Sequence, residues 1–530
     1  METLATLLQH TAEQYGSTPA LMYKPGSATE IWSYTHLNER ANRAAVWLRD
    51  HGVSKGDRII IWSPNNPSWV AAYFGAVRIG AIVVPLDVRS SVEFAERVAK
   101  QTEPKLVLAS KATAPTWNYP APSFMLEEIG ALPESDEQIS GQEVTLDDTA
   151  VLMFTSGTTG TPKGVILTHR NIMSNVEAVD KLVPDISHFR LVSLLPLSHM
   201  FEQTIGLVLA LKRGGSVYYI STLIPAKIFE AFKEQGTTAM LLVPQALQLF
   251  MSSIEREVEK QGKEKQWRRL QLIARFLPYK MRRLLFRPVY EKLGGKLEFL
   301  VSGGAPLPPD LFRKWDILGI PIMQGYGATE AAPCISVTSI KERNPYTVGR
   351  AVMDMQIKLA EDSEILIKGP NITPGYWRNP EATEQAFADG WYKTGDLGVF
   401  EKNGHLRIQG RKKDLIVLPN GQNVYPQDVE QELLLVPGVA DAVVVGLPIE
   451  DGAQVYAVLI AKEGAQLDPD AAVKQANSRL APHQYIRGAT VWPDKDFPRT
   501  HTLKVKKNEV LASIVAIRAA EKEPVLAVKR

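Results

Sequence analysis

The segment "TSGTTGTPKG", residues 155–164, combines hydroxyl side chains, glycines and a single lysine. Small residues let the backbone come close to a ligand, and free backbone N–H groups can cradle an anion. The hydroxyls and Lys163 add hydrogen-bond donors that suit phosphate oxygens. The segment therefore predicts a polyphosphate-binding loop. A flexible surface turn is the plain alternative, although such turns seldom combine these residue types between two buried strands.

This loop differs from the P-loop of nucleoside triphosphatases. That pattern requires G-x-x-x-x-G-K-[ST], whereas here Pro162 precedes Lys163 and Gly164 follows it. The apolar run "AVLMF" before the loop and the β-branched run "GVILT" after it predict strands on both sides. Because no helix N-terminus follows directly, the loop itself must hold the phosphates.

Three further segments carry residues that suit a nucleotide. In "QGYGATE" (324–330), Tyr326 offers a flat face for a purine, and Glu330 is a hard oxygen ligand suited to Mg²⁺. In "YKTGDL" (392–397), Asp396 can accept two hydrogen bonds from a ribose diol. The third is the basic run "GRKKD" (410–414). Taken singly, each has a plainer interpretation: a glycine turn, a turn carboxylate and a solvated surface run.

Alternating strands and helices must position these segments. "RIIIW" (58–62), "PSWVAAYFGAVRIG" (67–80) and "AIVVPL" (81–86) predict a strand, a helix and a strand, and hence a parallel sheet. "LEFLVSGG" and "IPIMQGYG" predict buried strands that end in glycine loops, where ligands of such sheets bind. From about residue 395, the hairpin cues Asn403-Gly404 and Asn420-Gly421 indicate a small α+β unit.

Length and composition set the outer bounds. A chain of 530 residues is too long for one ordinary core, so two or three domains are expected. Lys and Arg number 60 against 58 Asp and Glu, and this balance gives no support to a nucleic-acid partner. The single cysteine, Cys334, excludes an internal disulfide. The N-terminal segment lacks the pattern of a signal peptide, and no apolar run is long enough to span a bilayer, so the cytoplasm is the expected location.

The phosphate loop, the three nucleotide segments and "VSGGAPLP" (301–308) resemble, in the same order, the signatures of the adenylate-forming superfamily. This superfamily includes acyl-CoA synthetases, peptide-synthetase adenylation domains and luciferases. The resemblance covers nearly the whole chain and implies an α/β fold with two parts. Residues 1–412 would form a large, multi-subdomain N-terminal adenylation domain with parallel sheets. Residues 413–530 would form a small, mobile α+β C-terminal domain, with a hinge near Lys413.

The resemblance also implies roles for individual residues. Those that would hold ATP are Thr155, Ser156, Gly157, Thr158, Thr159, Gly160 and Lys163 in the loop, and Gly303, Gly304, Ala305, Tyr326 and Gly327 on the adenine side. Thr329 would meet the α-phosphate, Glu330 would hold Mg²⁺, Asp396 would bind the ribose, and Arg411 would reach the ribose or a phosphate. Gly421 would line the pantetheine path of CoA, where a narrow thiol arm passes close to the backbone; it is also a hairpin glycine that needs positive φ.

Two segments bear on catalysis. "PRTHTLK" (498–504) places Lys504 where the superfamily has its catalytic lysine, in a pattern like P-[KR]-T-x-x-G-K. Leu503 departs from the usual glycine, and "T-L-K" with basic residues after it resembles the form in long-chain acyl-CoA synthetases. A surface lysine in a basic tail is the alternative. "LPLSHMFEQ" (195–203) resembles the segment whose His199 lies by the acyl carboxylate. A metal pair of His199 and Glu202 lacks an apparent third ligand, and a packed core histidine is the remaining alternative.

The segment from 267 to 296, "WRRLQLIARFLPYKMRRLLFRPVYEKLGGK", mixes arginines and lysines with apolar residues at helical spacing. Leu270, Ile273, Ala274 and Leu277 share one helical face. Such a segment could touch anionic lipid or the phosphates of CoA. It could equally be a pair of surface helices packed on a core of its own, and the sequence favours neither.

We therefore expect ATP-dependent activation of a long-chain fatty acid to an acyl-adenylate, followed by thioester formation with CoA. The products would be acyl-CoA, AMP and pyrophosphate, and Mg²⁺ would assist. One alternative is delivery of the acyl group to the phosphopantetheine thiol of a carrier protein; another is an aryl or medium-chain acid as substrate. A luciferase-like oxygenase has no support in the sequence, and the presence of all four of Glu330, Asp396, Arg411 and Lys504 argues against a non-catalytic binder. A peripheral membrane contact would suit a long-chain substrate.

Overall fold

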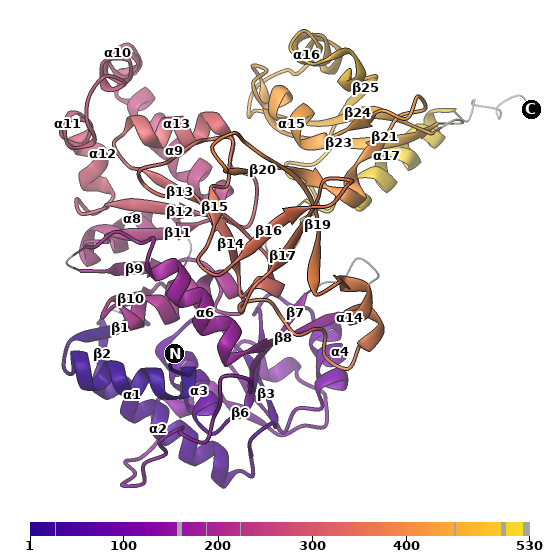
Figure 1. Cartoon of the computed structure of the whole chain (residues 1–530). Coiled ribbons are helices and arrows are strands. Elements are labelled where there is room, and N and C mark those ends of the chain that lie inside the picture. The colour runs from indigo at the N-terminus through magenta and orange to yellow at the C-terminus, as the bar shows by residue number, and fades with distance from the viewer. Residues whose placement is uncertain are drawn as a thin grey trace, which may run out of the picture. The chain divides into compact units, whose positions relative to one another are not determined.

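The computed structural model describes residues 1–26, 28–155, 162–186, 188–222, 224–449, 452–499 and 505–522. The chain divides into two compact units, and Figure 1 labels most of their helices and strands in chain order. Unit 1 comprises Met1–Ile357 and Ile367–Lys393, and unit 2 comprises Lys358–Leu366 and Thr394–Arg530. The expected boundary between residues 412 and 413 stays a prediction.

A nine-stranded sheet runs through unit 1 in the order β15-β14-β13-β12-β11-β9-β10-β1-β2. The pairs from β13 to β1 are parallel, and the outer strands β2, β14 and β15 are antiparallel. The strands are β1 Pro19–Tyr23, β2 Glu30–Ser33, β9 Arg190–Ser193, β10 Ser216–Tyr219, β11 Ala239–Leu242, β12 Phe299–Ser302, β13 Ile322–Gly327, β14 Cys334–Val337 and β15 Arg350–Ala351. The two strands predicted to end in glycine loops, β12 and β13, are therefore parallel neighbours.

The second large sheet of unit 1 has six strands in the order β6-β5-β3-β4-β7-β8. They are β3 Arg58–Trp62, β4 Ile82–Leu86, β5 Leu106–Ala109, β6 Ser123–Met125, β7 Thr149–Thr155 and β8 Lys163–Thr168. Strands β3 and β4 pair in parallel with helix α3 (Pro67–Arg78) between them in the chain, which confirms the predicted strand–helix–strand unit. Strands β7 and β8 pair antiparallel, which confirms that the glycine-rich loop joins two strands.

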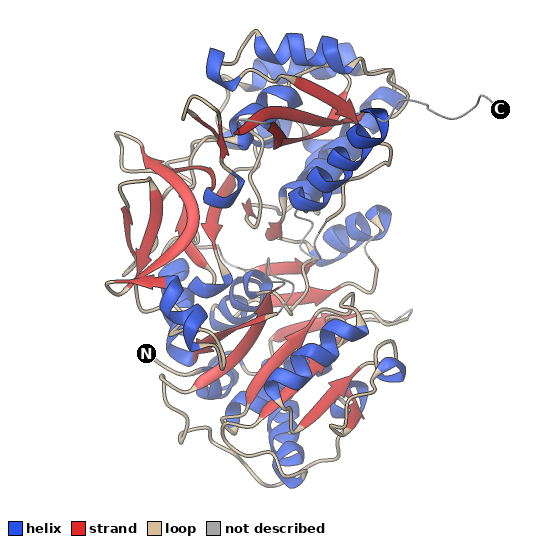
Figure 2. Cartoon of the chain, turned by 90° about the vertical axis from the view of Figure 1, so that its right-hand side faces the viewer, coloured by secondary structure: helices blue, strands red, loops and turns tan. Residues whose placement is uncertain are grey.

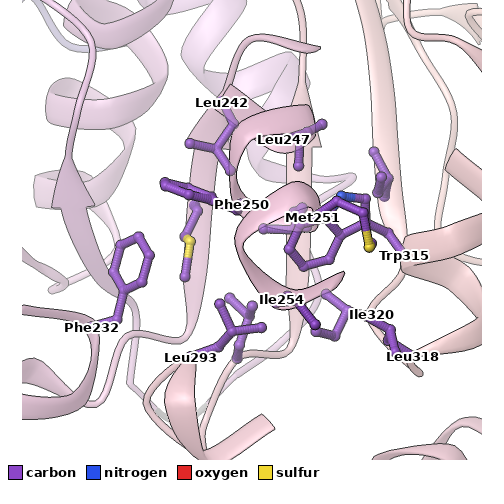
Figure 3. Packing of buried hydrophobic residues seen from close by; sticks show 14 of the residues in the cluster. Phe232, Leu242, Leu247, Phe250, Met251, Ile254, Leu293, Trp315, Leu318 and Ile320 are labelled. Atoms are coloured by element: carbon purple, nitrogen blue, oxygen red, sulfur yellow. The ribbon is translucent and has the colours of Figure 1, made fainter. Parts of the chain in front are cut away.

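Helices bury their apolar faces against these sheets, because only the buried face gains from leaving water. One core joins strands β9 to β13 with α8 (Pro225–Gln235), α9 (Pro244–Lys260) and α13 (Pro309–Ile317). Figure 3 shows Phe232, Phe250, Met251 and Trp315 packed within it. The other helices of unit 1 are α1 Leu4–Tyr15, α2 Tyr34–Asp50, α4 Val92–Thr102, α5 Leu126–Ile129, α6 His169–Asp180, π-helix η2 Phe201–Leu209, α7 Ala210–Lys212, α10 Glu264–Ala274, α11 Tyr279–Leu285, α12 Arg287–Lys292 and α14 Pro380–Ala386.

A five-stranded sheet occupies residues 356–411, in the order β16-β17-β19-β18 with β20 beside β19. Its strands are β16 Gln356–Leu359, β17 Glu364–Lys368, β18 Phe387–Ala388, β19 Trp391–Phe400 and β20 Leu406–Arg411. Strands β19 and β20 form the antiparallel hairpin predicted at Asn403-Gly404. A second hairpin, β21 (Ile416–Val417) and β22 (Asn423–Val424), confirms the prediction at Asn420-Gly421.

The rest of unit 2 is a three-stranded sheet covered by helices on both faces, as Figure 2 shows. Its strands are β23 Val439–Ile449, β24 Gly452–Ala461 and β25 Gly488–Val491, and its helices are α15 Pro426–Leu434, α16 Pro469–Asn477 and α17 Lys507–Lys522. Successive residues of a strand face opposite sides. Val444 accordingly packs with α15 and α16, whereas Val443 and Val445 pack with α17. The expected α/β class is confirmed. Within the described residues, no helix is long and apolar enough to cross a membrane.

Candidate active site

The strand that follows the glycine-rich loop brings Lys163 to a tyrosine far along the chain. Ser156, Gly157, Thr158, Thr159 and Gly160 lie outside the described residues, but Thr155 and Lys163 on either side pair across β7 and β8. The segment 375–377 adds to the free side of β8, with Ile166 N–H donating to Gly375 O at 3.1 Å and Trp377 N–H to Gly164 O at 2.7 Å. These bonds fix Tyr376, and Lys163 Nζ lies 5.4 Å from the centroid of its ring.

The same tyrosine contacts the proposed metal ligand. Tyr376 Oη donates to Glu330 Oε1 at 3.1 Å, and the hydroxyls of Tyr376 and Tyr392 lie 3.2 Å apart. Burial, and then the charge of Glu330, raise the pKa of Tyr376 above its usual range, so the phenol keeps the proton that it donates. Lys163, Tyr376 and Glu330 thus form one cluster, in which the Lys163 cation lies over the ring of a neutral phenol whose hydroxyl donates to the Glu330 carboxylate.

The turn that carries Glu330 is held by backbone contacts that require glycine. A Cβ at Gly327 would lie 2.1 Å from Pro333 O, too close for any side chain. Ala328 N–H donates to the same carbonyl at 2.9 Å, and Thr373 N–H donates to Glu330 O at 2.8 Å. Thr329 and Glu330 form the first residues of the 3₁₀ turn η3 (Thr329–Ala331), so the predicted phosphate and metal ligands are adjacent and both half-buried.

The adenine-side residues Gly303, Gly304 and Ala305 directly follow β12, and Tyr326 and Gly327 are the last two residues of the neighbouring strand β13. Gly304 has a φ of +81°, which favours glycine. A Cβ at Gly303 would meet the ring of Phe201 at 3.5 Å, so the first turn of η2 packs against this strand exit. The structure thereby places the His199 segment beside the predicted nucleotide residues of the same sheet.

His199 lies on the loop before η2, next to a buried carboxylate that the sequence did not suggest. Its Nε2 is 3.4 Å from Asp87 Oδ2, and Arg89 donates to both oxygens of Asp87, at 3.0 and 2.7 Å. Burial alone would raise the pKa of Asp87, but the hydrogen bonds from Arg89, aided by the nearby His199 imidazole, outweigh it and hold the carboxyl ionised. Asp87 is therefore a fixed negative charge that can orient the His199 imidazole.

We expect Asp87→Asn to lower the rate of adenylate formation about tenfold, because the negative charge that lies 3.4 Å from His199 Nε2 is lost. The apparent KM for ATP should stay within about twofold, since Asp87 is not among the predicted nucleotide ligands. Pyrophosphate release measured over a range of ATP concentrations gives both. The matched control is Asp147→Asn, which removes an exposed carboxylate paired with Arg170. Equal rates in the two variants would contradict an orienting role for Asp87.

Glu202, three residues after His199, is buried inside η2 against Gly206. Burial raises the pKa of its carboxyl to about 8, against a smaller lowering by Ser193, so the group is largely protonated at neutral pH. A protonated carboxyl is a poor ligand for a cation. Among the described residues no group of three or more His, Cys, Asp or Glu could hold a metal ion. The arrangement therefore gives no support to a metal pair of His199 and Glu202.

Unit 2 holds the remaining predicted residues. Asp396 on β19 pairs with Arg411 on β20, with Arg411 Nε 3.0 Å from Asp396 Oδ1; the carboxylate is buried and the guanidinium is half-exposed. Lys413 lies in the 3₁₀ turn that follows β20. Gly421 has a φ of +79° and open space where a Cβ would stand, so its backbone conformation is what requires glycine. Lys504 lies outside the described residues.

Two residues of the site, Asp87 and Tyr376, were not predicted from the sequence. Only Asp87 has a sequence feature that could have indicated its place. Asp87 directly follows strand β4, at the carboxyl end of a parallel strand, which is where functional side chains gather in such sheets. Tyr376 had no such feature, because its contacts with Glu330 and Lys163 join segments more than forty residues apart in the chain.

Strands β7 and β8 flank the glycine-rich loop, and Lys163 at its end and Glu330 both lie next to Tyr376. The charges of these two residues suit the phosphates of a nucleotide and a Mg²⁺ ion. The chain belongs to the family of AMP-binding enzymes: the family's profile matches residues 8–377, and that of the AMP-binding enzyme C-terminal domain matches residues 428–504. It is an adenylate-forming acid–CoA ligase of the superfamily that its motifs resemble.

Relatives and solved structures agree with this assignment. The chain is 30% identical to the long-chain-fatty-acid–CoA ligase FadD15 of Mycobacterium bovis, over 91% of each chain. It is also 30% identical to a feruloyl-CoA synthase from an Amycolatopsis species, over 90% of this chain and 93% of the relative. The crystal structure of ATP-bound MatB from Rhodopseudomonas palustris superposes with a TM-score of 0.80 at 25% identity, covering 97% of this chain and 99% of that one.

Proposed function

We propose that the protein converts a long-chain fatty acid to its CoA thioester in two steps. The acid's carboxylate first attacks the α-phosphate of ATP, which forms an acyl-adenylate and expels pyrophosphate. The thiol of CoA then attacks the acyl carbon and releases AMP. The long-chain substrate is favoured by the relative FadD15 and by the "TLK" form of the segment that ends at Lys504.

The observation that carries the first step is the cluster of Lys163, Tyr376 and Glu330. A carboxylate and a phosphate repel each other, so positive charge must surround the α-phosphate when they react. Lys163 places a cation at the end of the phosphate loop, 5.4 Å from the Tyr376 ring centroid. Thr329, adjacent to Glu330 in the same turn, adds a hydroxyl donor. We assign to these residues the binding of the ATP phosphates.

In nucleotide sites, Mg²⁺ is usually bound by one or two carboxylates together with the phosphates of the substrate. Glu330 suits the role of such a carboxylate. One oxygen of Glu330 accepts from Tyr376, and this bond orients the carboxylate. When bound there, Mg²⁺ would supply positive charge that neutralises the phosphate oxygens.

For the second step, we assign the mobile role to the C-terminal domain, residues 413–530, turning about a hinge near Lys413. Asp396, oriented by Arg411 at 3.0 Å, would accept hydrogen bonds from the ribose hydroxyls. Gly421, with open space in place of a Cβ, would let the pantetheine arm of CoA pass close to the backbone. Lys504 would act on the first step and be dispensable for the second.

Two alternatives differ in substrate or acceptor. Feruloyl-CoA synthase is as similar to this chain as FadD15 is, so an aryl acid is the second candidate substrate, beside a medium-chain acid. The acceptor in the other alternative is the phosphopantetheine thiol of a carrier protein, which presents the same arm as CoA.

Product mass spectrometry tests the proposal directly. The purified protein is incubated with ATP, Mg²⁺, CoA and a mixture of short, medium, long and aromatic acids. We expect long-chain acyl-CoA together with AMP. Acyl-AMP without any acyl-CoA would favour a carrier protein as acceptor, and an aryl-CoA product would overturn the long-chain assignment. No adenylate from any acid would contradict the proposed reaction as a whole.

A further inference from the structure

We propose that the outward faces of α10 and α11 form a membrane-docking surface that enters the interface of a bilayer containing anionic lipid. This surface comprises the apolar side chains Leu272, Ile273, Phe276, Met281 and Leu284 and the cations Arg268, Arg269, Arg275 and Lys280. The inference goes beyond the proposed reaction and does not depend on which acid the enzyme takes.

The apolar side chains of this surface are exposed together. Phe276 is 90% exposed and Leu284 is 65% exposed, and all five fall within residues 272–284. Single exposed apolar residues are ordinary on a protein surface, whereas a gathering of large ones marks a site of interaction. Ile273 shares a helical face with Ala274 by its spacing, but Ala274 is buried whereas Ile273 is 46% exposed.

The fold does not need these side chains for its own packing. Helix α10 has a separate inward face, on which Ala274 is buried and Trp267 and Leu270 pack against the core. Helix α11 is followed by Phe286, which is buried in the same core. The residues of the docking surface are exposed on these helices and on the turn between them, so water covers them in the free protein.

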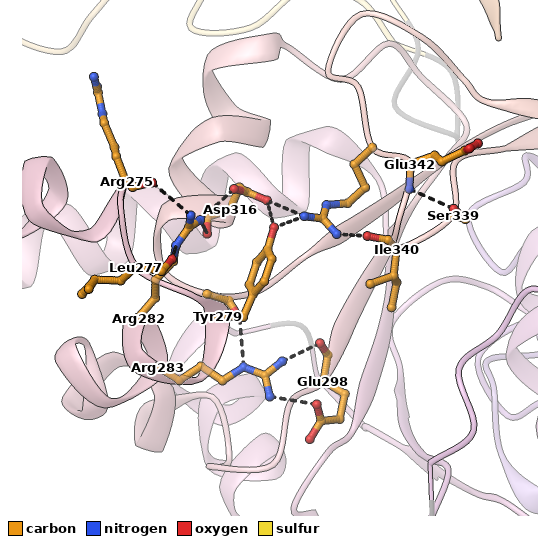
Figure 4. Close-up of polar contacts among 12 residues, drawn as sticks. Arg275, Leu277, Tyr279, Arg282, Arg283, Glu298, Asp316, Ser339, Ile340 and Glu342 are labelled. Atoms are coloured by element: carbon orange, nitrogen blue, oxygen red, sulfur yellow. Dashed lines mark hydrogen bonds and ion pairs between the residues drawn. The ribbon is translucent and has the colours of Figure 1, made fainter. Parts of the chain in front are cut away.

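The basic residues of the segment fall into two sets. Arg282 and Arg283 point inward: Arg282 pairs with Asp316 at 2.9 Å, and Arg283 pairs with Glu298 at 2.8 Å and donates to Gly319 O. Figure 4 shows this network, with Tyr279 also bonded to Asp316, and shows the side chain of Arg275 directed away from it. The first set fastens α11 to the body of unit 1, so that the outward face is presented on a fixed support.

The second set is available to a ligand. Arg268, Arg269, Arg275 and Lys280 are exposed, and in the part of the chain that the structure describes no carboxylate forms an ion pair with them. Residues 265–290 contain no Asp or Glu at all, so no negative charge within the segment offsets these cations. Exposed cations around large apolar side chains complement the interface of an anionic bilayer, where the phosphates lie above the acyl chains.

The test uses the full-length protein and sedimentation with vesicles, without ATP or CoA. We expect little binding to phosphatidylcholine alone and at least roughly tenfold stronger partitioning when about one third of the lipid is phosphatidylglycerol. The double variant Leu272→Ser/Phe276→Ser should lower that partitioning at least about tenfold. Arg268→Gln/Arg269→Gln should lower it roughly fivefold or more and weaken its dependence on salt.

Two matched controls separate a surface effect from a general one. Ile31→Ser removes an apolar side chain on β2 that is 59% exposed, close to the 57% of Leu272. Lys402→Gln/Lys462→Gln removes two exposed cations from unit 2. Both controls should bind anionic vesicles like the unmodified protein. The proposal is overturned if the unmodified protein does not bind anionic vesicles, or if Leu272→Ser/Phe276→Ser binds them as well as Ile31→Ser does. Neither result would bear on the ligase reaction, because no substrate is present.

Discussion

Lys504→Ala is expected to slow adenylate formation by about 10²–10³-fold, because an anion attacks an anion and the lysine would stabilise the charge that develops. ATP should bind nearly as well as before, since a group that acts only in the transition state contributes little to ground-state binding. The exchange of labelled pyrophosphate into ATP measures the first step, and calorimetric titration with a non-hydrolysable ATP analogue measures binding. Acyl-CoA formation from supplied acyl-adenylate should keep its rate.

The neighbouring lysine provides the control for this prediction. Lys506 is exposed and pairs with Glu509 at 2.8 Å, so Lys506→Ala removes the same charge from the same basic segment without touching the proposed catalytic group. The described residues on either side of Lys504 are anchored: Arg499 and Val505 form an antiparallel bridge, and Arg499 pairs with Asp441 at 2.6 Å. If Lys504→Ala and Lys506→Ala gave the same exchange rate, Lys504 would be one surface lysine among several.

Strands and hairpins that are determined by neighbouring residues in the chain could be predicted from the sequence. The β-branched runs on both sides of the glycine-rich loop have the period and composition of strands, and β7 and β8 lie where these runs predicted. The two Asn-Gly hairpins follow from backbone preference at single residues, such as the φ of +79° at Gly421. Such features depend on a few neighbouring residues, so a single sequence contains enough information.

Features that depend on distant segments could not be predicted in this way. Tyr376 acquires its place only when segment 375–377 adds to β8, and Asp87 meets His199 only when strands of two different sheets end close together. The exposure of Ile273 has the same origin. By spacing it shares a face with Leu270 and Ala274, but the core contacts those two residues and leaves Ile273 exposed.

Glu330→Gln is expected to raise the Mg²⁺ concentration needed for half-maximal adenylate formation by more than tenfold and to lower the maximal rate about 10²-fold. The substitution keeps the shape of the side chain and an oxygen that can still accept from Tyr376 Oη, so it removes the negative charge and little else. The measurement is pyrophosphate release against Mg²⁺ concentration at fixed ATP. Glu381→Gln, an exposed acid at the start of α14, is the charge-matched control.

Tyr376→Phe distinguishes the charge of this carboxylate from its orientation. The variant keeps the charge of Glu330 and the aromatic ring beside Lys163. It removes the 3.1 Å hydrogen bond to Glu330 Oε1 and the 3.2 Å contact with the Tyr392 hydroxyl. Loss of an outer partner typically costs about 10–100-fold in metal affinity, so the Mg²⁺ requirement should rise while the rate at saturating Mg²⁺ largely recovers. In Glu330→Gln excess metal should not restore the rate. A normal Mg²⁺ requirement in both variants would place the metal away from Glu330.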